Sequence, residues 1–254
     1  MRLFAALTAA LVLAGCQDVD PEPASGRAEA PPPGATASPE SPPPLERPAP
    51  EADDPEAGAS DEVVVLFFGD SLTAGYGLDN PDADAYPALV GAQIAEAGVP
   101  VRVVNAGVSG ETTAGGRGRI DWALRQTRPD VFVLALGGND GLRGLPPEAM
   151  EENLGATLAA VREAAPGARL VVAGMEAPPN MGDAYTSRFR AAFPSVAEAY
   201  DATLVPFLLE GVAGVARLNQ PDGIHPTPAG QQVMAETVAE VVVPLAEAAH
   251  TEAG

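Results

Sequence analysis

A serine directly follows a run of apolar residues. Residues 63–68 are six consecutive apolar residues, and Gly69-Asp70-Ser71-Leu72 come next. A short continuous apolar run that ends at glycine is typical of a strand buried on both faces, and the polar residues after it indicate a tight turn into a helix. Ligands of parallel α/β sheets lie outside the carboxyl ends of the strands, so Ser71 is a candidate nucleophile. The alternative is that Ser71 is an ordinary helix N-cap.

A matching base and acid occur near the other end of the chain. His225 is one of two histidines, and the other, His250, lies in the C-terminal tail. Imidazole is the most natural general base at neutral pH. Asp222 precedes His225 by three residues, and in a compact turn its carboxylate can hold the imidazole Nδ1–H and stabilise the imidazolium. The alternative is that Asp222 caps a turn and His225 caps the last helix.

A serine nucleophile also needs donors for the oxyanion that forms during attack. Gly110 has no side chain, so its N–H can approach a ligand closely, together with the N–H of Ser71. The side-chain amide of Asn139 is a third candidate donor, although Gly137-Gly138-Asn139-Asp140 is also ordinary turn chemistry. Asp70 resembles a second catalytic acid by position, but we favour a structural role in which it hydrogen-bonds the loop backbone beside Ser71.

These residues follow strands in a regular pattern of alternating elements. Strands are expected at 63–68, 101–105, 130–136, 169–174 and 203–205, and helices at 86–97, 113–128, 147–164, 184–200, 206–215 and 228–249. The alternation predicts a three-layer α/β/α sandwich around a flavodoxin-like five-stranded parallel sheet of order 2-1-3-4-5. Bends are expected at Pro194 and Pro244. In this order the loops after the first three strands meet at one edge, with Ser71, Gly110 and Asn139 on them.

The composition excludes several classes of protein. The chain has a net charge of −21, which argues against nucleic-acid binding. It contains no lysine, which excludes Schiff-base chemistry and a Walker-type phosphate loop. Its single cysteine excludes an intramolecular disulfide, and neither a zinc motif nor a dinucleotide-binding glycine motif is present. We therefore expect no metal.

The N-terminal part of the chain predicts export and a membrane anchor. Residues 1–16 have one positive charge, an apolar segment and small residues at the end, which is the pattern of a signal peptide. Leu13-Ala14-Gly15-Cys16 resembles the bacterial lipoprotein box, and this resemblance implies cleavage before Cys16 and lipidation of its sulfur. An ordinary signal peptide with an incidental cysteine is the alternative. Lipidated Cys16 would hold the protein at a membrane without spanning it.

The segment between the anchor and the folded domain is predicted to be a disordered linker. Twelve of the 46 residues at 17–62 are proline and twelve are Asp or Glu, so no core can form there. Such a linker would hold the domain away from the bilayer. The domain is expected at 63–249, followed by a short tail at 250–254, and the protein is expected to be a monomer.

Four sequence blocks together resemble the SGNH (GDSL-type) hydrolases, and within them the bacterial thioesterase I, lysophospholipase and arylesterase group. The blocks are Gly69–Leu72, Asn105–Thr112, Gly137–Gly144 and Asp222–His225, in the family's order and spacing. The resemblance implies Ser71 as nucleophile, Asp222 and His225 as acid and base, and Ser71, Gly110 and Asn139 as the oxyanion hole. It implies no metal and no cofactor.

The resemblance also implies the substrate class. The expected function is hydrolysis of carboxylic esters, such as aryl esters and lysophospholipids, with thioesters as a further capacity, through an acyl-enzyme on Ser71. The loops around Gly141, Leu142, Leu145 and Pro178 are expected to contact the acyl chain. A carbohydrate O-acetyl esterase and a non-catalytic acyl-binding lipoprotein are the alternatives. The expected location is the cell envelope, periplasmic or outer membrane, and Gln17 after the cysteine favours the outer membrane.

Overall fold

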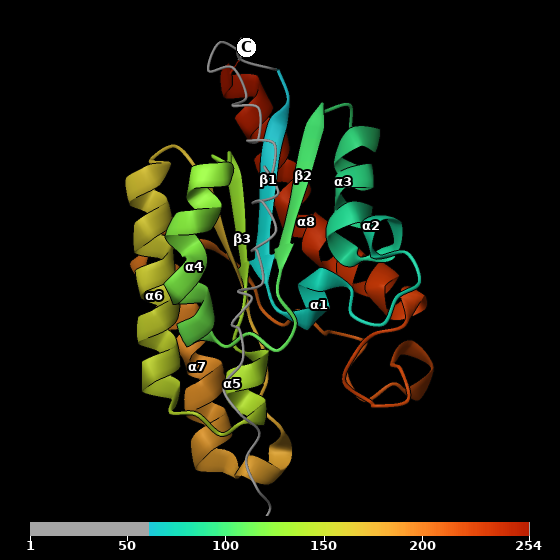
Figure 1. Ribbon diagram of the computed structural model, residues 1–254, viewed down its shortest axis with the longest axis vertical. Coiled ribbons are helices and arrows are strands. Elements are labelled where there is room, and N and C mark those ends of the chain that lie inside the picture. The colour runs from blue at the N-terminus through green and yellow to red at the C-terminus, as the bar shows by residue number, and fades with distance from the viewer. Residues whose placement is uncertain (1–60, 254) are drawn as a thin grey trace, which may run out of the picture. The chain divides into compact units, whose positions relative to one another are not determined.

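The computed structural model describes residues 61–253, and the predictions for the signal peptide, Cys16 and residues 17–60 of the linker lie outside them. Five parallel strands form one sheet in the predicted order, β2-β1-β3-β4-β5 (Figure 1). The strands are β1 (Val63–Gly69), β2 (Val101–Gly107), β3 (Val131–Ala135), β4 (Arg169–Ala173) and β5 (Thr203–Val205). The predicted fold class is therefore confirmed.

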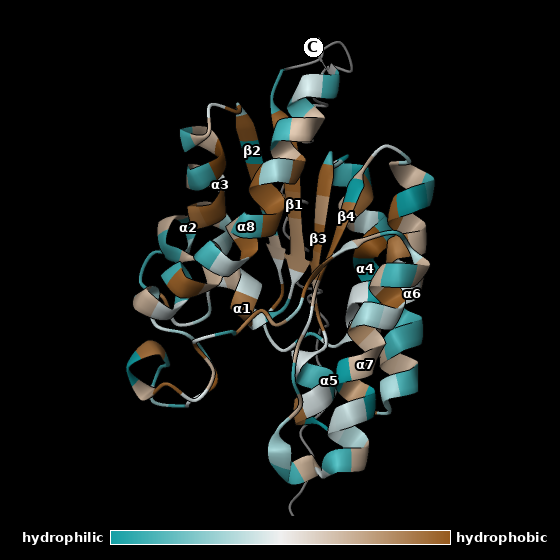
Figure 2. Cartoon of the chain, turned by 180° about the vertical axis from the view of Figure 1, so that it is seen from behind, coloured by the Kyte–Doolittle hydropathy of each residue, from teal (hydrophilic) through white to brown (hydrophobic). Residues whose placement is uncertain are grey.

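Strand β1 lies inside the sheet, between β2 and β3. All of its residues are buried, because helices cover both faces of the sheet and leave no exposed side for polar residues. Figure 2 shows the resulting apolar strands between helices with mixed surfaces. At the carboxyl end of β1, Gly69 pairs with Gly107 of β2 and with Ala135 of β3. The loops that follow these three strands therefore start from one place.

Two layers of helices enclose the sheet (Figure 1). Helices α3 (Tyr86–Glu96) and α8 (Pro228–Ala253) pack together on one face. Helices α4 (Thr113–Gln126), α6 (Pro147–Ala164) and α7 (Asp183–Ala199) cover the other. Short helices lie in the loops: α1 (Ser71–Ala74), α2 (Pro81–Asp84), α5 (Gly138–Leu142), η1 (Pro179–Met181) and η2 (Ala216–Leu218).

Several details differ from the sequence-based expectations. The helix expected at 206–215 is wrong: the chain forms turns there, because Gly211 and Gly214 adopt positive φ angles of 71° and 73° that a right-handed helix does not allow. Helix α5 replaces part of an expected loop. Helix α8 continues past residue 249 to Ala253, where Glu252 pairs with Arg169 at 2.7 Å.

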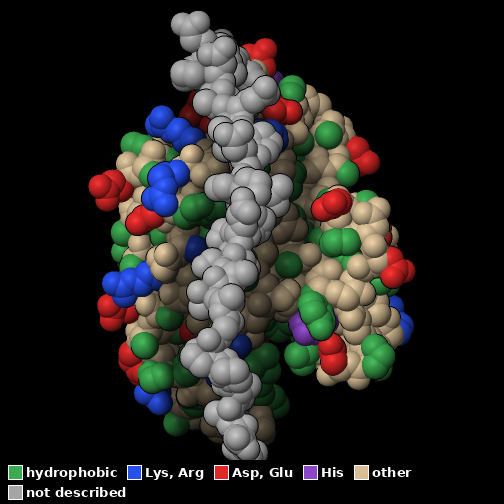
Figure 3. All heavy atoms as spheres, viewed as in Figure 1, with side chains coloured by type: hydrophobic (Ala, Val, Ile, Leu, Met, Phe, Trp, Pro, Cys, Tyr) green, Lys and Arg blue, Asp and Glu red, His purple; other side chains and the backbone are tan. Residues whose placement is uncertain are grey.

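The described surface carries acidic side chains spread among basic ones, as the face in Figure 3 shows. Within residues 61–253, none of the helices has both the length and the apolar character needed to cross a bilayer.

Two glycines of helix α4 differ in their surroundings, which leads to opposite predictions. A Cβ at Gly118 meets nothing within 4 Å, so Gly118→Ala should raise the free energy of unfolding by about 0.5–1 kcal/mol through helix propensity. A Cβ at Gly116 lies 2.3 Å from Leu136 Cδ1 and 3.1 Å from Phe68 Cε1, both on buried side chains. Gly116→Ala should therefore lower the free energy of unfolding by about 1–3 kcal/mol. Urea denaturation followed by circular dichroism measures the free energy of unfolding of both variants. Changes of the same sign in the two variants would contradict the different packing around Gly118 and Gly116.

Candidate active site

The residues singled out from the sequence meet at a cavity of about 610 Å³ at the carboxyl ends of β1, β2 and β3. Ser71, Gly110, Asn139 and His225 all line it. Three of them follow the first three strands, as the sheet order predicts. His225 comes from the loop before α8, so residues far apart in the sequence share one site.

Ser71, His225 and Asp222 form a continuous hydrogen-bonded chain. Ser71 Oγ lies 3.0 Å from His225 Nε2, and His225 Nδ1 lies 2.7 Å from Asp222 Oδ2. With Nδ1 donating to the carboxylate, Nε2 is the unprotonated nitrogen and accepts the serine proton. The arrangement has the geometry of a serine nucleophile, its base and the acid that orients the base.

The carboxylate of Asp222 is held by its own turn. Its Oδ1 accepts hydrogen bonds from the backbone N–H groups of Ile224 and His225, each at 3.0 Å. The hydrogen bond from the His225 ring, followed by these two backbone bonds, lowers the pKa of Asp222 to about 2. Asp222 is therefore ionised at any pH at which His225 is to act as a base.

Three groups in the cavity are able to donate to an oxyanion near Ser71 Oγ. Among the described residues, the N–H groups of Ser71 and Gly110 have no hydrogen-bond acceptor. Gly110 adopts a φ of +79°, which strongly favours glycine, and its carbonyl accepts from Arg143 Nη2 at 3.0 Å. Asn139 adds its side-chain amide at the start of α5.

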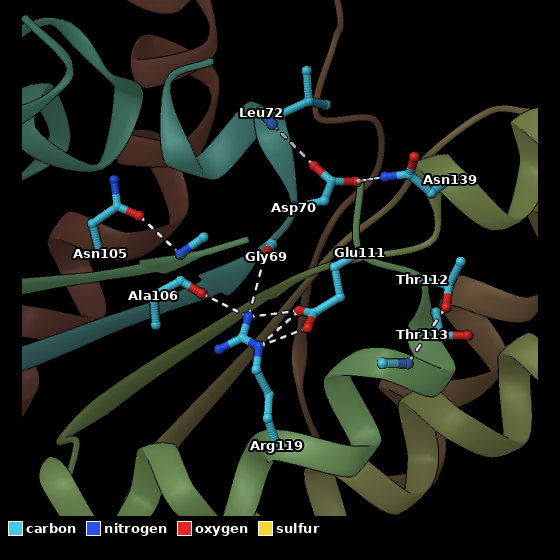
Figure 4. Close-up of polar contacts among 12 residues, drawn as sticks. Gly69, Asp70, Leu72, Asn105, Ala106, Glu111, Thr112, Thr113, Arg119 and Asn139 are labelled. Atoms are coloured by element: carbon cyan, nitrogen blue, oxygen red, sulfur yellow. Dashed lines mark hydrogen bonds and ion pairs between the residues drawn. The ribbon is translucent and has the colours of Figure 1, made fainter. Parts of the chain in front are cut away.

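Asp70 has the structural role predicted for it and one more. Its Oδ1 accepts from the backbone N–H of Leu72 at 3.0 Å, and its Oδ2 accepts from Asn139 Nδ2 at 3.3 Å (Figure 4). Burial raises the pKa of Asp70 to about 6, although both hydrogen bonds lower it. The second bond was not expected from the sequence, and it fixes which way the Asn139 amide points.

Apolar side chains form most of the cavity wall. Leu72, Leu142, Met175, Phe207 and Leu209 line it, and so does Pro178. Such a wall suits a hydrocarbon chain.

Of the four residues expected to contact substrate, Leu142 and Pro178 line the cavity, whereas Gly141 and Leu145 do not. Gly141 is turned toward the interior, where a Cβ would lie 3.0 Å from the Phe189 ring. Leu145 lies beyond the short helix α5, and its carbonyl accepts from Tyr185 Oη at 2.7 Å. The unexpected helix α5 accounts for both differences, because it turns these residues away from the cavity.

Two residues that support His225 were missed. The Tyr76 ring lies 4.6 Å from the His225 ring, measured between centroids. Gln220 Nε2 donates to the carbonyls of Tyr76 at 2.7 Å and of Pro226 at 3.0 Å, which ties the serine segment to the histidine loop. The only feature that marks Tyr76 in the sequence is its position between two glycines, Gly75 and Gly77.

The described residues contain no group of three or more His, Cys, Asp or Glu side chains that could together hold a metal ion. The side chains of Ser71, His225, Asp222, Asp70 and Asn139 are instead hydrogen-bonded to one another or to backbone groups.

The chain is similar in sequence to a known family of proteins. The profile of the GDSL-like Lipase/Acylhydrolase family matches residues 67–233. The chain belongs to this family. It is therefore a hydrolase of carboxylic esters, and the family relationship expected from the four sequence blocks is confirmed.

Individual relatives align with this chain over most of their own length. An arylesterase of Vibrio mimicus is 38% identical over 185 residues, which cover 73% of this chain and 90% of the relative. The thioesterase 1/protease 1/lysophospholipase L1 of Escherichia coli K12 is 36% identical over 189 residues, which cover 74% of this chain and 86% of the relative. The crystal structure of TesA superposes with a TM-score of 0.68 at 40% identity, covering 72% of this chain and 99% of that one.

The buried carboxyl of Asp70 predicts a specific pH dependence of stability. Because its pKa is raised from 3.8 to about 6, the folded state holds a proton that the unfolded state has lost between these values. Stability therefore falls as the pH rises through this window, by about 3 kcal/mol in total. Asp70→Asn removes the titration, so the variant should gain about 2–3 kcal/mol relative to wild type between pH 4 and pH 7.

Urea unfolding of both proteins at pH 4, 5, 6 and 7 measures this difference. Subtracting the unfolding free energy of the variant from that of wild type cancels the contributions of the other carboxylates to the pH dependence. These include Asp222, whose lowered pKa makes stability rise with pH instead of fall. A wild-type-minus-variant difference that does not change with pH would contradict a buried Asp70 with a raised pKa.

Proposed function

We propose that this chain cleaves carboxylic esters through an acyl-enzyme on Ser71, with aryl esters and lysophospholipids as its substrate classes. The observation that carries the proposal is the Ser71–His225–Asp222 chain, with contacts of 3.0 and 2.7 Å at the edge of an apolar cavity. Thioesters are a further substrate class that the same attack can serve.

Acylation follows from the hydrogen bonds. His225 Nε2 takes the Ser71 proton as Oγ attacks the ester carbonyl, and Asp222 stabilises the imidazolium that forms. The carbonyl oxygen becomes negative and is held by the N–H groups of Ser71 and Gly110 and the amide of Asn139. Donors already fixed at this position stabilise the transition state without reorganisation at the moment of reaction.

Acylation ends when the tetrahedral intermediate collapses: the C–O bond to the alcohol breaks, and His225 gives its proton to the leaving alcohol. In deacylation the neutral imidazole takes a proton from a water molecule that attacks the acyl-enzyme. The second oxyanion occupies the same donors. Its collapse breaks the bond to Ser71 Oγ, returns the proton to Ser71 and releases the carboxylic acid.

Two observations support acyl esters as the substrate class. The cavity wall is apolar around Leu142, Met175 and Phe207, which favours a hydrocarbon chain over a sugar. Relatives that match over most of their length carry the names arylesterase and lysophospholipase L1. The proposed site is complete within one chain, so a monomer is sufficient for the reaction.

Replacement of the nucleophile tests the proposal. Ser71→Ala removes the attacking oxygen, so kcat/KM for p-nitrophenyl acyl esters should fall by at least about 10⁴-fold. Initial rates across acyl lengths from acetate to laurate, with acetylated sugars and a lysophospholipid in the same panel, measure this loss and the preference. Equal and negligible activity of wild type and variant on the whole panel would contradict the proposal.

Ser109 offers the matched control. It also lines the cavity, but the hydroxyl that hydrogen-bonds His225 Nε2 is that of Ser71, and within residues 61–253 no hydrogen bond joins the Ser109 hydroxyl to His225. Ser109→Ala should change kcat/KM by less than about tenfold, since no nucleophile is lost.

We further propose that the enzyme is a lipoprotein of the cell envelope, periplasmic or at the outer membrane, anchored through Cys16. The support is the sequence of residues 1–16, with its apolar segment and Leu13-Ala14-Gly15-Cys16. An ester hydrolase held at a membrane would have lysophospholipids within reach.

Cys16→Ala tests the anchor. Mass spectrometry of the protein purified after cleavage before Cys16 should detect lipid on the N-terminal cysteine. The variant should move from the membrane to the soluble fraction, because one or more acyl chains supply the membrane affinity. A wild-type protein that is soluble and carries no lipid would disprove the anchor without bearing on the hydrolase activity.

A further inference from the structure

The side chain of Arg119 joins the ends of the two strands that lead into the proposed oxyanion hole. Its Nη2 donates to the carbonyl of Ala106 in β2 at 2.7 Å and to the carbonyl of Gly69 in β1 at 3.3 Å (Figure 4). The same Gly69 carbonyl accepts from the N–H of Val108 at 2.9 Å. One guanidinium from helix α4 therefore bridges the exits of both strands.

Glu111 pairs with Arg119 in two-pronged geometry. Arg119 Nε lies 2.7 and 2.9 Å from the two carboxylate oxygens, and Nη2 lies 2.6 Å from Oε2. The guanidinium also stacks on Phe68, with Cζ 3.8 Å from the ring centroid. The exposed fractions of the two charged side chains are only 19% and 8%. A planar, bidentate and stacked pair suits Arg specifically, and loss of either partner leaves a largely buried charge unpaired.

The sequence leaves room for this pair. The first turn of helix α4 contains Gly115 and Gly116, which lower helix propensity. A Cβ at Gly115 would lie 3.0 Å from Glu111 Cγ, and one at Gly116 would lie 3.1 Å from the Phe68 ring. The glycines thus allow the helix to approach the charged pair and the ring beneath it.

The pair lies next to the proposed oxyanion donors without facing the cavity. Glu111 directly follows Gly110, and Gly69 precedes Ser71 by two residues. Gly110 and Ser71 line the cavity, whereas neither Glu111 nor Arg119 does. The charged pair therefore contacts the segments that carry both backbone donors without lining the cavity.

We propose that the Glu111–Arg119 pair is a positioning unit that sets the distance between the Ser71 and Gly110 N–H groups. This inference rests on the proposed function, in which these two groups hold the oxyanion. If the pair sets that distance, its loss weakens binding of the transition state more than binding of the substrate. The effect then falls on kcat and leaves KM nearly unchanged.

Arg119→Met tests the proposal, because Met keeps the apolar stem on Phe68 and removes the guanidinium. For p-nitrophenyl butyrate, kcat should fall about 10- to 100-fold with KM within about twofold of wild type. Affinity for a trifluoromethyl ketone, which forms a tetrahedral adduct with the serine, should fall by a similar factor. Arg119→Lys should recover part of the loss, since one ammonium reaches fewer of the same acceptors.

Arg117→Met is the matched control. Arg117 lies two residues earlier on α4 and pairs with Glu152 at 3.2 Å, with both side chains largely exposed. Its loss should leave kcat, KM and the ketone affinity unchanged. All variants are assayed well below the midpoint of their thermal unfolding, so that a lower melting temperature does not count as lower activity.

The outcomes separate a positioning role of the pair from a purely structural one. Where Arg119→Met does not fold, Glu111→Gln and Arg119→Lys take its place in the same assays. Folded variants that keep the wild-type kcat would overturn the proposal, and so would folded variants with a reduced kcat but unchanged affinity for the ketone. Failure of Arg119→Met, Glu111→Gln and Arg119→Lys to fold would also overturn it, since the pair would then be structural only. An inactive wild type would instead contradict the proposed function, which the Ser71→Ala comparison detects separately.

Discussion

The structure of the site depends on how closely the backbone of helix α1 approaches the ends of the central strands. Gly69 and Gly107 pair across β1 and β2, and neither has space for a side chain. A Cβ at Gly107 would lie 2.3 Å from the backbone N of Ala74, and one at Gly69 would lie 2.0 Å from Thr73 Oγ1. Because the turn rests directly on the strand ends, Ser71 takes its position from the sheet itself and not from a flexible loop.

Four carboxylates in or near the proposed active site have different roles because their surroundings differ. Asp222 lies in an exposed turn with three hydrogen-bond donors and stays ionised. Asp70 is buried with two donors, and its pKa rises toward neutrality. Glu111 is largely buried but has a guanidinium as partner, and Asp140 accepts from both the N–H and the hydroxyl of Thr113. Burial, together with the number and charge of the donors, thus decides which carboxylate orients a base and which ones hold the loops.

The sheet and the proposed catalytic residues could be predicted from the sequence, whereas much of their support could not. Buried parallel strands are continuous apolar runs, so β1 and β3 stand out, and their order places Ser71 and Asn139 at one edge. The expected helix at 206–215 failed because Gly211 and Gly214 outweigh the apolar residues around them. Gly141 was misplaced for a related reason, since a five-residue helix gives no periodic signal.

Some side-chain contacts were beyond prediction for a different reason. The Glu111–Arg119 contact depends on how the loop that holds Glu111 packs against α4, and the bond from Asn139 to Asp70 depends on how the starts of α5 and α1 face each other. Neither relation leaves a local pattern, because no periodicity or motif records the separation of residues from different elements. Such contacts become visible only in the folded structure.

The histidine side of the site is built differently from the serine side. Residues 206–227 contain little regular structure, so side-chain amides take the place of a sheet. Asn219 Nδ2 donates to the carbonyls of Val212 at 2.7 Å and Val215 at 3.1 Å, while the Gln220 N–H donates to the His225 carbonyl at 2.7 Å. Gln220 Nε2 then reaches across to the Tyr76 carbonyl. The serine is thus positioned by packing against the strand ends, and the histidine by a few hydrogen bonds from side-chain amides and backbone groups.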